Sequence, residues 1–196
     1  MMYSAGMKRF LLLAALALAG CAAAPPPLPP GSVRVAPGLV LVLPQPAELG
    51  RSLEATQLVT AHYGAQTFVF EGHVSATPER LLLVGLDPMG RKALSVTWSA
   101  SGIQAETAPW LPEQLHPENM LADLVLLYWP EAVVRRGLAG SGGTVTSGAR
   151  SRSIGLDGQE LIHADYGQDD AWTGSLHYRN LAWGYGLDVQ SAEVAR

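Results

Sequence analysis

Alternation of apolar and polar residues with a period of two is the feature that most limits how this chain can fold. In residues 66–76, every second side chain from Phe68 to Val74 would lie on one face of a strand, opposite a more polar face. Similar segments recur and are separated by short turns: 53–63, 66–76, 80–86, 91–99, 103–107, 144–154, 159–166, 172–181 and 183–189. Such spacing is typical of antiparallel hairpins. The sequence therefore predicts a mainly β fold.

A helical period replaces the alternation between residues 117 and 138. Apolar residues recur there every three or four positions, namely Met120, Leu121, Leu124, Val125, Leu127 and Tyr128. We place Asp123 off this apolar stripe. Pro117 suits the first position of a helix, and Pro130 divides the segment, so that a second helix would span 131–138.

The order of strands, helices and strands predicts one domain over residues 51–196, because no second linker interrupts it. We expect a mainly β (α+β) fold in which a curved antiparallel sheet forms an incomplete β-barrel with a helical lid. A barrel that is not filled by its own side chains can hold an apolar ligand; a filled core is the alternative. The candidate cavity-lining residues are Leu83, Leu94, Val96, Trp98, Leu124 and Leu127.

The first 20 residues have the outline of a secretory signal peptide. Lys8 and Arg9 precede an apolar run over 10–19 that is too short to span a bilayer. The segment ending at Cys21 resembles a bacterial lipobox, in which the cysteine is lipidated and becomes the mature N-terminus. Cys21 is the only cysteine, which excludes an intrachain disulfide; an ordinary signal peptide with a chance cysteine is the alternative. Residues 21–50, rich in proline, would then form a tether.

Charge limits the partners of the chain. The formal net charge is −4 at pH 7 and becomes about −6 when Lys8 and Arg9 leave with the signal peptide. This balance argues against a nucleic-acid partner, and membrane attachment would depend on acyl chains rather than on basic residues. In many Gram-negative lipoproteins, aspartate after the lipidated cysteine signals inner-membrane retention. By that similarity, Ala22 favours the periplasmic face of the outer membrane.

Catalytic motifs are scarce. Ser175 lacks the flanking glycines of a hydrolase elbow, and the glycine-rich segment 140–144 lacks the lysine of a phosphate-binding loop. The five histidines have no spacing typical of a metal site, and we interpret Asp169 and Asp170 as part of a solvated turn. We therefore expect no catalytic residue, no metal and no cofactor.

Four segments, read in order, resemble a known family: QLVTA at 57–61, LVGLDPMGRK at 83–92, MLADLVLLYWP at 120–130 and YRNLAWGYGLDVQS at 178–191. Together with the lipobox, they resemble LolB, the outer-membrane lipoprotein receptor, and its soluble relative LolA. A closer similarity is to the family of LolB-like lipoproteins that often accompany aryl polyene biosynthesis genes.

The resemblance implies a half-open barrel whose apolar cavity receives acyl chains. The protein would be a lipid-anchored, non-catalytic carrier or receptor for an acyl chain, a lipoprotein or a polyene lipid. It would accept this cargo from a donor such as a LolA-like periplasmic carrier and deliver it to the outer membrane. A structural lipoprotein with a filled core and an acyl-ester-processing enzyme are the alternatives.

The turn that follows residue 86 holds Met89 between Pro88 and Gly90. LolB has a protruding loop with an exposed leucine that helps to deliver lipoproteins, and the resemblance implies that Pro88 and Met89 form a membrane-contact loop here. A flexible thioether is a suitable apolar tip for such a loop. The alternative is that Met89 folds back to cover the sheet.

Overall fold

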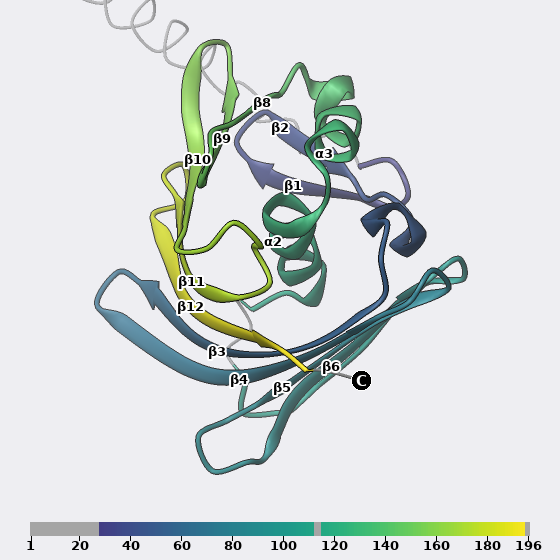
Figure 1. Cartoon of the computed structure of the whole chain (residues 1–196), viewed down its shortest axis with the longest axis vertical. Helices are drawn as coiled ribbons and strands as arrows, with labels where there is room; N and C mark the ends of the chain where they lie inside the picture. Colours follow the sequence, from purple (N-terminus) through teal and green to yellow (C-terminus); the bar gives the residue numbers. More distant parts are fainter. Residues whose placement is uncertain (1–27, 112–114, 195–196) are drawn as a thin grey trace, which may run out of the picture.

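A computed structural model describes residues 28–111 and 115–194 (Figure 1). The predicted signal peptide, residues 1–20, and the predicted lipidation site at Cys21 lie outside the described residues. Within the described ranges, no helix is both long enough and apolar enough to span a membrane.

In the described part of the chain, ten strands form one antiparallel sheet in the spatial order β7-β6-β5-β4-β3-β12-β11-β10-β9-β8. The strands are β3 (Leu53–Tyr63), β4 (Gln66–Ala76), β5 (Arg80–Leu86), β6 (Lys92–Ser99), β7 (Gly102–Thr107), β8 (Thr144–Ser147), β9 (Ser151–Leu156), β10 (Gln159–Tyr166), β11 (Gly174–Asn180) and β12 (Tyr185–Glu193). Each half is a meander of sequential hairpins, and the pairing of β3 with β12 joins the halves. Because β7 and β8 remain at the two edges, the sheet is not closed into a barrel. The predicted mainly β class is confirmed.

The sheet curves around helix α2 (Pro117–Tyr128), which lies on its concave side (Figure 1). Leu121 and Leu126 of this helix are almost completely buried. Arg152 of β9 donates hydrogen bonds from Nη1 to the carbonyl oxygens of Leu126 at 2.8 Å and Trp129 at 2.9 Å. These bonds satisfy carbonyl groups that have no partner within the helix. The half of the sheet formed by β8 to β12 therefore fixes the C-terminal end of α2 through β9.

A two-stranded hairpin, separate from the large sheet, packs against α2. It consists of β1 (Ser32–Ala36) and β2 (Leu39–Val42). Val35 and Leu41 are buried in the core. Asn180, at the end of β11, donates Nδ2 to the carbonyl oxygen of Val35 at 2.9 Å, which ties the hairpin to the large sheet.

The hairpin shows that the predicted tether over residues 21–50 is too long. From Ser32 onward these residues belong to the folded domain, and a short 3₁₀ helix, η1 (Pro46–Leu49), leads from the hairpin to β3. The segment VRVAPGLVLVL contains enough apolar residues at alternate positions to form a buried hairpin. The prolines around this segment are typical of a tether, and the prediction followed them rather than the alternation.

Helix α3 (Glu131–Leu138) and the 3₁₀ helix η2 (Ala139–Ser141) connect α2 to the second half of the sheet. The bounds of α3 agree with the second predicted helix. Helix α3 packs against β2 and β8. A Cβ atom at Gly137 would lie 2.7 Å from the carbonyl oxygen of Val42, so glycine permits this close approach of helix and strand.

Three other segments differ from the sequence-based prediction. The strand expected over 183–189 begins at Tyr185 and continues to Glu193. Residues 144–154 were expected to form one strand, but they contribute to the β8–β9 hairpin, whose turn follows Ser147. The strand expected over 172–181 begins only at Gly174. Trp172 instead enters the interior, where its ring stacks on Tyr128 with the ring centroids 4.1 Å apart.

Candidate functional site

The concave face of the sheet and helix α2 enclose a cavity of about 440 Å³. Strands β3, β4, β5, β6 and β12 form its wall, and α2 covers it. The lining is mainly apolar and includes Phe68, Phe70, Leu83, Leu94, Leu124 and Leu127. Its volume lies within the range of about 300–1,000 Å³ that is usual for small-molecule sites.

The cavity is open because small residues occupy wall positions at which larger side chains would fill the space. Gly72 of β4, Gly85 of β5 and Ala61 of β3 all line it. Gly72 is not among the glycines with positive φ, and a Cβ atom there would meet its neighbours at ordinary contact distances of 3.7 to 3.9 Å. Neither strain nor crowding requires glycine at this position. A larger residue at position 72 would therefore extend into the cavity.

Four of the six residues expected at the wall and lid line this cavity: Leu83, Leu94, Leu124 and Leu127. Val96 and Trp98 alternate in phase with Leu94 on β6, but they lie in the solid part of the core rather than at the cavity. The Trp98 ring packs on the ring of Trp129, with the centroids 5.7 Å apart. The contact with Trp129 fills the interior at this point, so the cavity does not extend to Val96 and Trp98.

A carboxyl group lies on the α2 side of the cavity, among apolar residues. Oδ1 of Asp123 accepts hydrogen bonds from the hydroxyl groups of Tyr178 at 2.7 Å and Tyr185 at 2.9 Å, and the Tyr185 hydroxyl is also 2.9 Å from Oδ2. Burial raises the pKa of Asp123 to about 6, and the two hydrogen bonds oppose this increase. Asp123 is therefore a half-buried acid that lines the cavity and is held by neutral donors.

The prediction that Asp123 lies off the apolar stripe of α2 is wrong. Asp123 follows Met120 by three positions and precedes Leu127 by four, so the three residues share the face that lines the cavity. This spacing in the sequence could have predicted that Asp123 shares the face of Met120 and Leu127. What the sequence did not reveal is that Tyr178 and Tyr185, on β11 and β12, meet this helix.

Other polar groups also line the cavity. Gln57 is buried and donates Nε2 to the hydroxyl oxygen of Tyr128 at 2.8 Å and to Oγ of Ser191 at 3.1 Å. His116, at the N-cap position of α2, and Asn119 in its first turn line the cavity as well. Polar side chains from His116 to Asp123 thus follow the cavity side of α2, one helical turn apart.

The turn between β5 and β6 is organised by Asp87, which is buried beneath it. Oδ1 of Asp87 accepts hydrogen bonds from the backbone N–H groups of Met89 and Arg91, both at 2.9 Å. Oδ2 accepts a hydrogen bond from Nε of Arg91 at 2.7 Å. Burial acts to raise the pKa of Asp87, but the hydrogen bonds from Arg91 and Met89 outweigh it and hold the pKa below its usual value. These bonds fix the shape of the turn.

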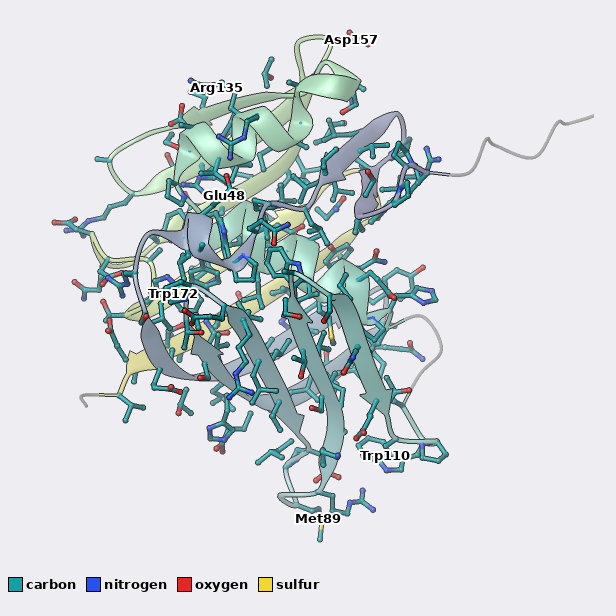
Figure 2. All side chains as sticks on the ribbon, turned by 90° about the vertical axis from the view of Figure 1, so that its right-hand side faces the viewer. Glu48, Met89, Trp110, Arg135, Asp157 and Trp172 are labelled. Atoms are coloured by element: carbon teal, nitrogen blue, oxygen red, sulfur yellow. The ribbon has the colours of Figure 1, made fainter. Side chains whose placement is uncertain are left out.

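Met89 points away from the sheet at the tip of this turn (Figure 2). Its side chain is 81% exposed, and Pro88 beside it is exposed as well. The alternative in which Met89 folds back to cover the sheet is therefore wrong.

Exposed apolar side chains gather at the end of the sheet where Met89 lies. Strand register places the β3–β4, β5–β6 and β11–β12 turns and the segment after β7 at this end. These segments carry Tyr63, Met89, Leu181 and Trp110, all large and exposed. We call these four residues the apolar rim; Figure 2 shows Met89 and Trp110 together at one end of the molecule. The guanidinium group of Arg91 lies over the Trp110 ring, 5.1 Å from its centroid.

Four of the histidines, all on strands of the sheet, pair with carboxylates: His62, His73, His163 and His177. His177 and His62 contact the two carboxylate oxygens of Asp188 at 2.7 and 3.0 Å, and His177 is the main reason that the pKa of Asp188 is lowered. His163 contacts Glu160 at 2.8 Å, which raises the pKa of the histidine. In the described ranges, no group of three or more histidine, cysteine, aspartate or glutamate residues has an arrangement that could hold a metal ion.

An open, curved antiparallel sheet that encloses a mainly apolar cavity against an internal helix defines the class of this protein. Residues 54–193 match the model of a family described as protein of unknown function, DUF3261. The match covers more than half of the chain, so the protein belongs to the DUF3261 family. No curated protein matches the chain.

Proposed function

We propose that this protein is a non-catalytic, lipid-anchored carrier or receptor that takes an acyl chain or a lipidated cargo and delivers it to the outer membrane. The single observation that carries the proposal is the mainly apolar cavity of about 440 Å³ between α2 and the concave face of the sheet. The resemblance of the four sequence segments to LolB-like lipoproteins, including those that accompany aryl polyene genes, supports it independently.

Hydrocarbon burial provides the driving force in this proposal. Each methylene group that moves from water into an apolar site contributes about 0.8 kcal/mol. Several methylenes among Phe68, Phe70 and Leu127 would therefore contribute several kcal/mol, with no nucleotide required. The cargo would pass from a LolA-like donor to this cavity and then to the membrane according to differences in affinity.

Lipidation of Cys21 would hold the domain close to the bilayer. The ten residues 22–31 separate this cysteine from the first strand. Ten residues reach at most about 35 Å when fully extended. In this proposal the apolar rim touches the membrane, and Arg91 and Lys92 beside Met89 meet lipid phosphates.

Filling the cavity from position 72 tests the proposal. Wild-type protein, purified from membranes, should carry extractable lipid and should bind the neutral apolar dye N-phenylnaphthylamine with an increase in fluorescence. Gly72→Phe should bind the dye at least about tenfold more weakly, because the ring displaces contacts worth two or more methylenes. Gly72→Ala is the matched control, because its Cβ atom meets only ordinary contacts and leaves most of the cavity open.

The two variants separate loss of binding from loss of folding. Both should keep the circular dichroism spectrum of the wild type, because position 72 has an unstrained strand conformation. Dye binding that is equal in wild type and a folded Gly72→Phe variant would overturn the proposal, as would wild-type protein that retains no lipid and binds no dye.

A further inference from the structure

The cavity contains one acidic group in a position that an acyl chain does not explain. Asp123 lies on α2 between Met120 and Leu127, and all three residues line the cavity. Burial of a carboxylate in an apolar setting is unfavourable unless the group is paired. The described residues place tyrosine hydroxyls on this carboxylate, but no lysine or arginine.

From this geometry we infer that the cargo carries a hydrogen-bond donor, a hydroxyl or an ammonium group, which binds Asp123 while the hydrocarbon part fills the apolar cavity. A ligand with a carboxylate group in place of this donor would bind more weakly. This inference rests on the proposed carrier function and specifies the chemical class of its cargo.

The hydrogen-bond inventory leaves room for such a donor. An ionised carboxylate accepts about four hydrogen bonds on its two oxygens and donates none. Tyr178 donates to Oδ1 at 2.7 Å, and Tyr185 is 2.9 Å from both oxygens. Among the described residues, Oδ2 thus has one shared donor, and its remaining lone pair can accept a hydrogen bond from a ligand.

The two tyrosines hold the carboxylate in place and do not replace the ligand. Burial raises the pKa of both Tyr178 and Tyr185, so both remain protonated donors at neutral pH. Their ring centroids lie 5.7 Å apart, and the Trp183 ring stacks on Tyr185. The aromatic cluster therefore fixes the direction of the acceptor oxygens without adding a positive charge.

Electrostatics separates the ligand classes. A hydrogen bond from an ammonium group to a carboxylate is charge-assisted and is about twice as strong as one between neutral groups. A hydroxyl group donates a hydrogen bond without changing the local charge. A carboxylate ligand would place a second negative charge beside Asp123, and two adjacent carboxylates oppose each other's ionisation.

Three ligands with ten carbon atoms each test the inference. Decylamine, decanol and decanoate would be titrated at about pH 8 against wild-type protein loaded with N-phenylnaphthylamine, and dye displacement would give their affinities. At that pH the Asp123 carboxyl is ionised, since its pKa is about 6. Decylamine and decanol should each bind at least about tenfold more tightly than decanoate, as expected for a hydrogen bond to a charged group.

Two matched substitutions assign this preference to the cavity. Asp123→Asn keeps an oxygen for the tyrosine donors but removes the charge, and it should reduce the ratio of decylamine to decanoate affinity by about tenfold. Asp169→Asn makes the same change at an aspartate whose side chain is 87% exposed, and it should leave the ratio unchanged. A ratio that survives Asp123→Asn would overturn the inference.

The wild-type titrations decide the inference even if Asp123→Asn does not fold. Decanoate that binds as tightly as decylamine and decanol would overturn it. If all three ligands bind equally and Gly72→Phe abolishes their binding, the inference fails while the carrier proposal stands. If none of the three ligands displaces the dye and the dye binds Gly72→Phe as well as wild type, both fail.

Discussion

Tyr178 and Tyr185 hold the Asp123 carboxyl group in place but supply no positive charge. The loss of hydration outweighs their hydrogen bonds, so the pKa of Asp123 rises to about 6. Ionisation of this one residue therefore weakens the folded state. A ligand that donates to the carboxylate would offset the effect, because binding to the folded state stabilises it.

This balance predicts a pH-dependent effect of Asp123→Asn. The folded-state pKa of Asp123, about 6, lies above its ordinary value of 3.8, so the folded protein binds more protons between these values and loses stability through this group as the pH rises. Asp123→Asn has no carboxyl group at this position, so it does not lose stability in this way as the pH rises. Its free energy of unfolding, relative to wild type, should increase by about 2 kcal/mol from pH 4 to pH 7.5. Urea unfolding at both pH values measures the difference.

Asp169→Asn is the control for this prediction, because the same change on an exposed side chain should give nearly equal shifts at both pH values. Glu160 and Asp188 have lowered pKa values and gain stability as the pH rises, but they do so in every variant and cancel in the comparison. Parallel pH profiles for wild type and Asp123→Asn would contradict the burial-driven increase in pKa.

The β1–β2 hairpin and α3 are short elements that cover the core beside α2. The hairpin packs against α2, and α3 packs against β2. The contact with α3 is close because Gly137 has no side chain at the point where the helix meets the carbonyl oxygen of Val42. Backbone atoms cannot move away as a flexible side chain can, so this approach depends on glycine.

We expect Gly137→Ala to destabilise the protein despite the better helix propensity of alanine. The new Cβ atom would lie 2.7 Å from the Val42 carbonyl oxygen and 2.8 Å from Cδ1 of Leu41. Overpacking of this kind reduces stability by about 1–3 kcal/mol, of which about 1 kcal/mol is recovered from propensity. Thermal and urea unfolding measure the net loss.

Gly140→Ala provides the matched comparison, since a Cβ atom there has no neighbour within 4 Å. It should be neutral or slightly stabilising. Equal stability of the two variants would mean that α3 can move away from β2 without loss of packing.

At the scale of the whole molecule, the apolar rim and the cavity lie at the same end of the sheet. Tyr63 belongs to both, because it is exposed in the apolar rim and also lines the cavity. Met89 and Trp110 extend the rim along neighbouring turns (Figure 2). Under the proposed function, this arrangement would present the cavity to the membrane that the rim touches.

Met89→Glu should reduce binding to anionic liposomes by about tenfold, because it replaces an apolar tip by a charge that opposes contact with lipid. Folding should be unaffected, since the side chain is 81% exposed. Liposome co-sedimentation and transfer of a fluorescent lipid measure the effect. Leu58→Glu is the control, because Leu58 is exposed on β3 and is not one of the four residues of the apolar rim; equal losses in both variants would exclude a specific role for Met89.

Much of the sheet could be predicted because the two-residue period and the turn residues are local properties. The alternation of Leu94, Val96 and Trp98 places them correctly on one face of β6. The β1–β2 hairpin was missed because its apolar residues lie between prolines, in a segment that composition alone assigned to a tether. Its place in the core depends on α2 and α3, which are distant in sequence.

The candidate site was predicted only in part for a related reason. Leu83, Leu94, Leu124 and Leu127 could be chosen by periodicity because each faces the inside of its own element. The same reasoning did not show where the interior becomes solid, which is decided by the contact of Trp98 with Trp129. Nor did it identify Asp123, whose partners come from β11 and β12.

By itself the sequence determined most strands of the large sheet, the two helices and most of the inward faces, because these follow from the period of side chains along a single element. Only the tertiary structure decided that Gly72 leaves space, that Asp123 borders this space, and that Met89 lies at the same end of the sheet. Such features depend on contacts between elements that are distant in sequence, and side-chain periodicity within one element carries no information about those contacts.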